Sequence, residues 1–180
     1  HLNNKYYLNN KKNNLNNSLK VDNLFWMFYT NIYNLSFDDI DSRYNKEKAI
    51  KIEYIEKLRK IKNKLKEKKI KLTQIENELL NESNITIITI FALSILYNIN
   101  LMYINNNKYF EVINNDEKEI ILILYREDKY ELLDDNNEKN IEFYKNNYLY
   151  INNIEKPLKS VTSYSKDELI NMCIKLSFKN

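Results

Sequence analysis

The stretch VDNLFWMFYTNIYNL, residues 21–35, holds the residues whose order most suggests chemistry. Asp22 and Asn23 stand directly before a run of apolar residues that includes the chain's one tryptophan, Trp26. An enzyme can set a nucleophile at the head of a buried helix in this way. The same pattern also describes an ordinary core helix, because Asp and Asn are preferred caps for a helix N-terminus. Both interpretations are open at the level of the sequence.

Residues that could supply a nucleophile or a metal ligand are scarce elsewhere. His1 is the one histidine and Cys173 the one cysteine, which rules out an internal disulfide and any zinc site built from cysteines. We expect Cys173 to be a small buried residue of a C-terminal helix, not a nucleophile. The carboxylates of Asp38, Asp39 and Asp41 could hold a metal ion, but we predict that they are loop residues. No metal and no cofactor is therefore expected.

Glycine is absent from all 180 residues, and proline occurs once. A P-loop and a G-x-G-x-x-G fingerprint both need glycine, so the usual nucleotide-binding motifs are excluded. A nucleophile elbow of the G-x-S-x-G type is excluded for the same reason. Asparagine must then take over the turns and left-handed backbone positions that glycine normally serves, because its side chain tolerates that region best.

Basic residues concentrate between residues 57 and 71, although the formal net charge of the chain is only +3. A Lys-rich helix face can contact phosphate backbones, and it can equally be a solvated face without a partner. Glu53, Glu56 and Glu67 dilute the field, and no aromatic residue shares the face for base stacking. The candidate nucleic-acid-binding residues are Lys57, Arg59, Lys60, Lys62, Lys64, Lys66, Lys68 and Lys69.

The predicted elements divide the chain into three parts. Residues 1–20 are Asn-rich and without sustained period, and they are expected to form an extended arm. Residues 21–155 are expected to form a core domain, and residues 156–180 a linker and a C-terminal helix. Apolar spacing predicts helices over residues 22–34, 46–69, 72–81 (capped by Thr73) and 85–98.

Strands are predicted over residues 100–104, 109–113, 120–125, 128–133 and 148–151, with the segments NNN and NNDEK as hairpin turns. The uncharged run 83–107 is long enough to be tested as a membrane span, but asparagines interrupt it and we expect no span. Together these elements predict an α+β fold. N-terminal helices would pack on a small, mainly antiparallel β-sheet, followed by a C-terminal helix.

The last segment, SYSKDELINMCIKLSF, predicts a helix with Ser165 as N-cap and Glu168 three residues later, which is a capping box. Its buried stripe would consist of Leu169, Met172, Cys173 and Leu176. The segment resembles the first helix of a SAP-type DNA-binding module, whose second helix would lie beyond Asn180, and an ordinary capped helix fits it as well. Because the sequence begins with His1, we expect it to be a piece of a longer chain.

The opening stretch and the order of elements resemble the OTU (ovarian tumour) papain-like cysteine peptidases. That family opens its nucleophile helix with Asp-Gly-Asn-Cys-Leu-Phe, and VDNLFW keeps Asp22, Asn23, Leu24 and Phe25 without the cysteine. The unit IFALSILYNINLMYINNNKYFEVI resembles the family's helix-strand-turn-strand unit, and Lys129 stands where the family has its histidine. The resemblance implies a degenerate papain-like fold that has lost its catalysis, because this chemistry needs a thiolate and a nearby base.

A second resemblance runs over nearly the whole chain. The stretches DNLFWMFYTNIYNLSF, IENELLN and IEKPLKSVTSYSKDELINMCIKL, with the long Lys-rich helix, are similar to uncharacterised proteins of AT-rich giant DNA viruses of the mimivirus kind. The bias toward Asn, Ile, Lys and Tyr, whose codons are AT-rich, agrees with it. The resemblance implies a setting in the virion or in the viral factory of the host cytoplasm.

These observations predict a non-catalytic structural or interaction protein, such as a minor capsid or capsid-associated component of the virion of a large DNA virus. Its partners would be other viral structural proteins or further copies of the chain, and the arm would be ordered by these neighbours. Two alternatives are open. One is a nucleic-acid-associated viral protein that uses the Lys-rich helix 57–71, and the other is an OTU-like cysteine hydrolase or its inactive relative.

Overall fold

The computed structural model describes residues 21–37, 42–133 and 138–177, and these form an α+β fold. The predictions for the arm 1–20, for His1 and for Asp38, Asp39 and Asp41 lie outside the described residues. A short 3-10 helix, η2, spans Val161–Ser163. The helices α1 to α7 are Asn23–Tyr33, Arg43–Lys60, Lys62–Glu67, Leu72–Asn81, Ile87–Tyr97, Glu138–Asn147 and Lys166–Ser177.

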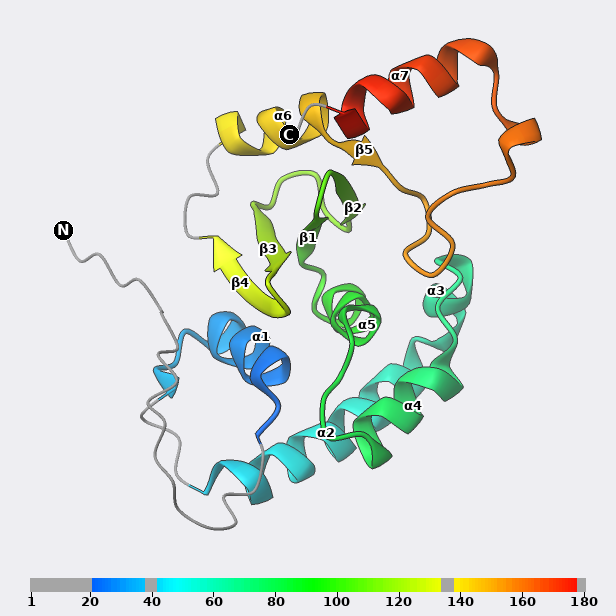
Figure 1. Cartoon of the computed structure of the whole chain (residues 1–180). Coiled ribbons are helices and arrows are strands. Elements are labelled where there is room, and N and C mark those ends of the chain that lie inside the picture. The colour runs from blue at the N-terminus through cyan, green and yellow to red at the C-terminus, as the bar shows by residue number, and fades with distance from the viewer. Residues whose placement is uncertain (1–20, 38–41, 134–137, 178–180) are drawn as a thin grey trace, which may run out of the picture.

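Five strands form one sheet in the order β4-β3-β1-β2-β5 (Figure 1). β1 pairs with β2 and β3 with β4 in antiparallel fashion, whereas β1 with β3 and β2 with β5 are parallel pairs. The predicted α+β class is confirmed, with a mixed sheet in place of a mainly antiparallel one. The strands are β1 Asn100–Asn105, β2 Lys108–Val112, β3 Ile120–Arg126, β4 Lys129–Leu133 and β5 Leu149–Tyr150.

The sheet lies between two helical layers. In Figure 1, α1, α2, α4 and α5 lie on one side of the sheet and α6 on the other, with α7 beside β5. Alternate residues of β1 serve the two layers, because successive side chains of a strand point to opposite faces. Leu101 and Tyr103 belong to the larger core with the N-terminal helices, and Met102 and Ile104 belong to a smaller core with α6.

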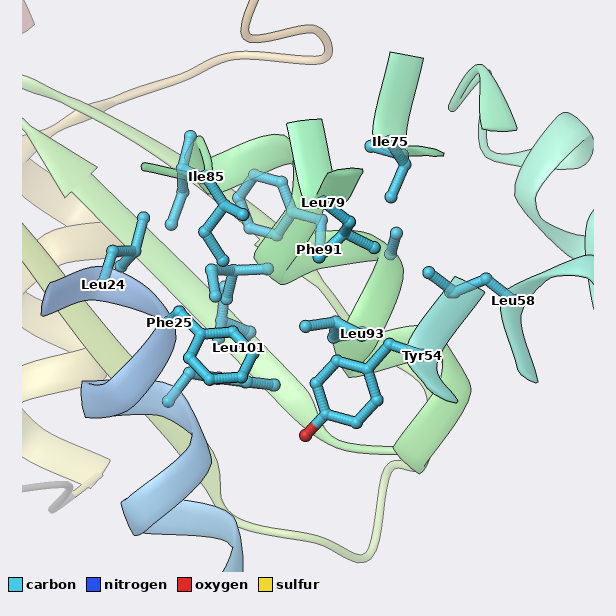
Figure 2. Close-up of a cluster of buried hydrophobic side chains, with 14 of the residues drawn as sticks. Leu24, Phe25, Tyr54, Leu58, Ile75, Leu79, Ile85, Phe91, Leu93 and Leu101 are labelled. Carbon is cyan, nitrogen blue, oxygen red and sulfur yellow. The ribbon is translucent and has the colours of Figure 1, made fainter. Parts of the chain in front are cut away.

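The larger core is centred on α5. This helix is apolar on nearly all sides, which is typical of a helix enclosed by other elements. Figure 2 shows Phe25, Tyr54 and Leu93, from α1, α2 and α5, pointing into this core. The uncharged run 83–107 thus contains the central helix α5 and the strand β1. No helix in the described parts of the chain is long and apolar enough to cross a membrane.

Asparagine serves left-handed backbone positions, as the absence of glycine predicts. Asn34 and Asn98 end α1 and α5 with φ of 49° and 55°, and Asn106 in the β1–β2 turn has φ of 53°. The two-residue turn between β3 and β4 uses Glu127 and Asp128, both with positive φ, which favours the tight hairpin. Several residue types therefore replace glycine, with asparagine at the helix ends.

The predicted helix 46–69 is interrupted at Ile61. α2 ends at Lys60, and in Figure 1 the chain leaves the axis of α2 before it forms α3. Leu65 of α3 is fully buried, so the bend returns the chain toward the core. The helix 72–81 has the predicted bounds, but its N-cap is Lys71 and not Thr73, which lies inside the first turn.

The segment NNDEK, residues 114–118, is not a hairpin turn. β2 and β3 lie on opposite sides of β1, so the connection between them crosses the end of β1. Asn100, the buried first residue of β1, holds this crossing through its side chain. Its Oδ1 accepts hydrogen bonds from the backbone N–H groups of Asn114 (2.8 Å) and Asn115 (3.0 Å), and its Nδ2 donates to the carbonyl of Lys118 (2.8 Å).

The C-terminal helix has the predicted cap but not the predicted burial. The Ser165 N–H donates to the Glu168 carboxylate (2.7 Å) and the Glu168 N–H donates to Ser165 Oγ (3.2 Å), which confirms the capping box. Cys173 is exposed, however, so its expected place on a buried stripe is wrong. The physical reason is that α7 lies at the edge of the fold beside β5, where no second layer formed by the described residues covers it. Helix α6 was not predicted.

Candidate functional site

The head of α1 is held by Asp22, which is fully buried. Its Oδ1 accepts a hydrogen bond from the backbone N–H of Phe25 at 3.1 Å, the geometry of an N-cap. Its Oδ2 accepts a second one from the N–H of Ile85 at 2.7 Å, just before α5. The Nζ of Lys51 in α2 lies 2.9 Å from the same oxygen. One carboxylate therefore connects α1, α2 and the start of α5.

A second buried carboxylate, Glu47 in α2, completes the cluster. Its Oε1 lies 2.9 Å from Lys51 Nζ, and its Oε2 accepts a hydrogen bond from Trp26 Nε1 at 2.7 Å. The same oxygen accepts the backbone N–H of Asp22 at 3.2 Å. We call Asp22, Trp26, Glu47 and Lys51 the Asp22 network. Every polar side-chain group in it has a partner, as buried polar groups require.

The Asp22 network encloses two carboxylates and one ammonium group, a formal charge of −1 away from water. Burial raises the pKa of the Asp22 carboxyl, while Lys51 and the N–H groups of Phe25 and Ile85 act in the opposite direction. The Lys51 ammonium also lies 5.2 Å from the centre of the Phe25 ring. Such an enclosed cluster fixes the positions of the helices.

The head of α1 offers no nucleophile. Asn23 is followed directly by Leu24, an apolar side chain that is 4% exposed, so the cysteine that the peptidases carry between these two positions is missing. Lys129, which stands at the position of the family's histidine, is exposed at the start of β4 opposite Arg126. The basic side chain that contacts Asp22 is Lys51. Among the described residues the one thiol is that of Cys173 in α7, which lies on the other side of the sheet from α1 in Figure 1. The arrangement suits a structural role.

Glu78 in α4 is a third buried carboxylate, and it binds the beginning of α5. Its Oε2 accepts hydrogen bonds from the backbone N–H of Thr86 at 2.9 Å and from Thr89 Oγ1 at 2.6 Å. The hydroxyl of Thr86 donates to both carboxylate oxygens. Thr86 is the N-cap residue of α5, but its side chain makes no capping hydrogen bond to the helix, and Glu78 supplies the acceptor for the Thr86 N–H at this helix start.

The spacing of Glu47 and Glu78 relative to nearby apolar residues indicates that both carboxylates are buried, but the prediction of buried positions rested on the apolar residues alone. Glu47, Lys51, Tyr54 and Leu58 are spaced by 4, 3 and 4 residues, so the two charges lie on the buried side of α2. Glu78 similarly follows the buried Ile75 by three residues in α4. A charge at an apolar position of a helix indicates a buried ion pair or cap, but its partner cannot be named from local spacing.

The basic candidate residues are distributed over the end of α2, α3 and the turn that follows. Lys57 pairs with Glu53 at 2.6 Å and Arg59 with Glu76 at 2.7 Å. The other basic candidates are exposed and form no ion pair with any residue that the structure describes: Lys60, Lys62, Lys64, Lys66, Lys68 and Lys69. The structure also places two tyrosines beside Lys57, Tyr33 of α1 and Tyr97 of α5, which sequence spacing could not indicate.

The described residues form a small hollow but no cluster that could hold a metal ion. No group of three or more His, Cys, Asp or Glu residues among the described residues could hold a metal ion. A hollow of about 130 Å³ lies between the β1–β2 hairpin and the chain at Ile151 and Pro157. Ligand pockets begin at roughly 300 Å³, so this hollow is too small for a typical substrate.

Comparison with protein-family models, with characterised proteins and with solved structures gave no match to this chain. Any function must therefore be argued from the sequence and from the fold and contacts described above.

Proposed function

We propose that this chain is a non-catalytic protein that acts by binding other proteins. The carrying observation is the apolar surface of its C-terminal part, which we call the C-terminal surface. Its members are 40 to 70% exposed although they are large and apolar: Leu158, Val161, Ile170, Ile174 and Leu176. Ile170 and Ile174 are four residues apart in α7 and therefore share one face of that helix, and an exposed apolar helix face is typical of a surface that a partner covers.

The Asp22 network supports the non-catalytic part of the proposal. The Asp22 carboxylate is engaged with Lys51 and with the N–H of Ile85, and the chain has no cysteine between Asn23 and Leu24. Because Asp22 connects α1, α2 and the start of α5 in this way, we assign it a role in stability and not in catalysis. The likeness to papain-like peptidases stays a prediction about ancestry, and activity as a cysteine hydrolase has no support from these contacts.

The setting that we propose is the virion of a large DNA virus, where the chain would be a minor capsid or capsid-associated component. This part rests on the resemblance to giant-virus proteins and on the AT-rich codon bias. Its partners would be other structural proteins of the particle or further copies of the chain.

Quantitative mass spectrometry of purified virions, separated by salt extraction into shell and genome-bearing core, tests the setting. We expect recovery with the shell at a fixed copy number. Absence from virions, or recovery with the genome alone, would overturn the structural role.

The exposed thiol of Cys173 provides a direct test of the C-terminal surface. It lies in α7 between Ile170 and Ile174, so a covering partner would shield it from a maleimide reagent. We expect fast labelling of the isolated chain and at least tenfold slower labelling in intact shells. Equal labelling rates in both states would remove the C-terminal surface as the contact, even if the chain is a shell component.

A further inference from the structure

The segment from Lys57 to Lys71 is the most basic stretch of the chain. It contains nine basic residues and one acidic residue, Glu67, a local charge of +8. The whole chain carries +3, so the remaining residues together carry −5. We call this segment the basic segment. Such an asymmetry is the electrostatic signature of a surface for a polyanion, because nearby like charges repel one another unless a counter-charge is bound.

The backbone of the basic segment is fixed by packing against the larger core. Leu65 is fully buried in the larger core, and Ile61 and Ile70 pack against that core from either side. Lys69 takes a left-handed conformation with φ of 61°, and the Ile70 N–H donates to the Leu65 carbonyl at 2.9 Å, which ends α3. The lysines next to Leu65 are therefore displayed from a fixed backbone, and binding a polyanion would not first have to order it.

An aromatic pair adjoins the beginning of the basic segment. The hydroxyls of Tyr33 and Tyr97 lie 3.0 Å apart, and Lys57 Nζ lies 5.9 Å from the centre of the Tyr97 ring. Tyr33 is 43% exposed, so part of its ring is open to a ligand. The hydrogen bond between the hydroxyls of Tyr33 and Tyr97, together with burial, raises the pKa of Tyr33 to about 12. These two rings come from α1 and α5, and no local pattern in the sequence indicates that they lie beside α2.

We propose that the basic segment and Tyr33 together bind single-stranded nucleic acid. The exposed lysines would contact successive phosphates, and an unpaired base would stack on the Tyr33 ring beside Lys57. A duplex presents the same phosphates but hides the faces of its bases, so it cannot use the ring. This binding is independent of the C-terminal surface, which lies on α7 and the chain before it.

Fluorescence anisotropy with a labelled 20-nucleotide oligo-dT and with a duplex of equal length tests the proposal on the full chain. We expect tighter binding of the single strand and an affinity that falls steeply as salt rises. The double variant Lys62→Glu with Lys66→Glu should lower the affinity at least tenfold. It should also reduce the slope of log K against log salt by about 1.4, since each phosphate contact on a single strand contributes about 0.7.

Two controls separate the basic segment from a general effect of charge. Lys139→Glu with Lys156→Glu makes the same change in net charge at exposed sites of α6 and of the chain before η2, and it should leave the affinity nearly unchanged. The Lys62→Glu, Lys66→Glu variant should also keep the far-UV circular dichroism spectrum of the original chain. Equal losses in the two double variants would overturn the assignment to the basic segment.

Substitution of Tyr33 tests the choice of single strand over duplex. Tyr33→Leu should weaken single-strand binding by about 5- to 150-fold, the range found for one stacked base, and leave duplex binding unchanged. Tyr33→Phe keeps the ring and should retain the affinity. Tyr150→Leu removes a ring of similar exposure from β5 and should have no effect. Binding that is absent at 50 mM salt, or that prefers the duplex and ignores Tyr33→Leu, would overturn the proposal.

Discussion

Two buried carboxylates, Asp22 and Glu78, hold consecutive residues at the start of α5, yet they are satisfied in different ways. Asp22 accepts the N–H of Ile85 and Glu78 accepts the N–H of Thr86. Asp22 also binds the ammonium of Lys51, which it shares with Glu47. Glu78 has neutral donors, the hydroxyls of Thr86 and Thr89. One centre thus depends on a counter-charge, and the other depends on the N–H and O–H groups of a helix start.

This difference indicates which substitutions should lower the free energy of unfolding most. A buried ion that loses its counter-charge keeps its full desolvation cost, whereas a buried carboxylate that loses one neutral donor keeps its remaining partners. The loss of Lys51 should therefore cost more than the loss of any single donor to Glu78. Trp26, the one tryptophan, donates to Glu47 and is fully buried, so its fluorescence reports on unfolding of this region directly.

The largest effect is expected for Lys51→Met, which removes the cation and leaves Asp22 and Glu47 facing each other without it. We expect a loss of about 3–5 kcal/mol in the free energy of unfolding, measured by urea titration followed by Trp26 fluorescence. Lys57→Met is the matched control on the same helix. Its pair with Glu53 is exposed on both sides, so it should cost less than about 1 kcal/mol. Equal losses would show that the Asp22 network does not depend on its cation.

A smaller effect is expected for Glu78→Gln. The amide still accepts hydrogen bonds with its oxygen, but its NH₂ group would point at donors that now lack an acceptor. We expect a loss of about 1–3 kcal/mol in the same urea titration. Glu76→Gln, two residues earlier in α4, changes a carboxylate whose partner Arg59 is exposed, and it should cost under about 1 kcal/mol. A loss for Glu78→Gln as large as that for Lys51→Met would remove the distinction between the two centres.

These partners show what could be predicted from the sequence and what could not. Local spacing predicted a cap at Asp22 or Asn23, the bounds of α4 and the capping box at Ser165, because each depends on residues that are close in sequence. The contacts of Asp22 with Lys51 and Ile85 join residues 29 and 63 positions apart, so no local pattern contains them. The crossing of β1 held by Asn100 was missed for the same reason.

Predictions about burial failed where they relied on apolar spacing alone. The stripe of α7 has the period of a buried face, and so does that of α4. α4 packs against both α2 and α5, whereas α7 lies beside the short edge strand β5 and its Cys173 and Leu176 stay exposed. An amphipathic helix predicts that a partner surface exists, and the remaining chain decides whether it is present. At the candidate site, likewise, the lysines were visible in the sequence but the neighbouring tyrosines were not.

A loss of about 1 kcal/mol is expected for Thr89→Val, which removes one donor to Glu78 and keeps the shape of the side chain. The carboxylate retains the N–H and the hydroxyl of Thr86, so the helix start should stay capped. Thr89→Ser keeps the hydroxyl and serves as the comparison in thermal unfolding. A Thr89→Val loss above that of Glu78→Gln would mean that packing around Thr89, and not the hydrogen bond, determines its contribution.

The smallest effect is expected in the pH dependence of Asp22, because burial and Lys51 act on its pKa in opposite directions. Burial prevails, so the pKa of the folded state lies above that of the unfolded chain, which is about 3.9. A raised pKa means that folding takes up a proton, so this contribution is fully present below the unfolded pKa. It is lost as the pH rises through the folded pKa. The stability of the original chain relative to Asp22→Asn should therefore decline as the pH rises above about 4 and through the folded pKa.

Urea titrations of the original chain and of Asp22→Asn across that pH range show whether the stability difference falls or rises with pH. A relative stability that rises with pH would mean that Lys51 and the N–H donors outweigh burial, and the Asp22 network would then resemble an ordinary salt bridge. Lys51→Met sharpens the test, because it removes the main contribution that lowers the pKa of Asp22. The decline with pH should become steeper in that background, whereas removal of a donor to Glu78, as in Thr89→Val, should leave the slope unchanged.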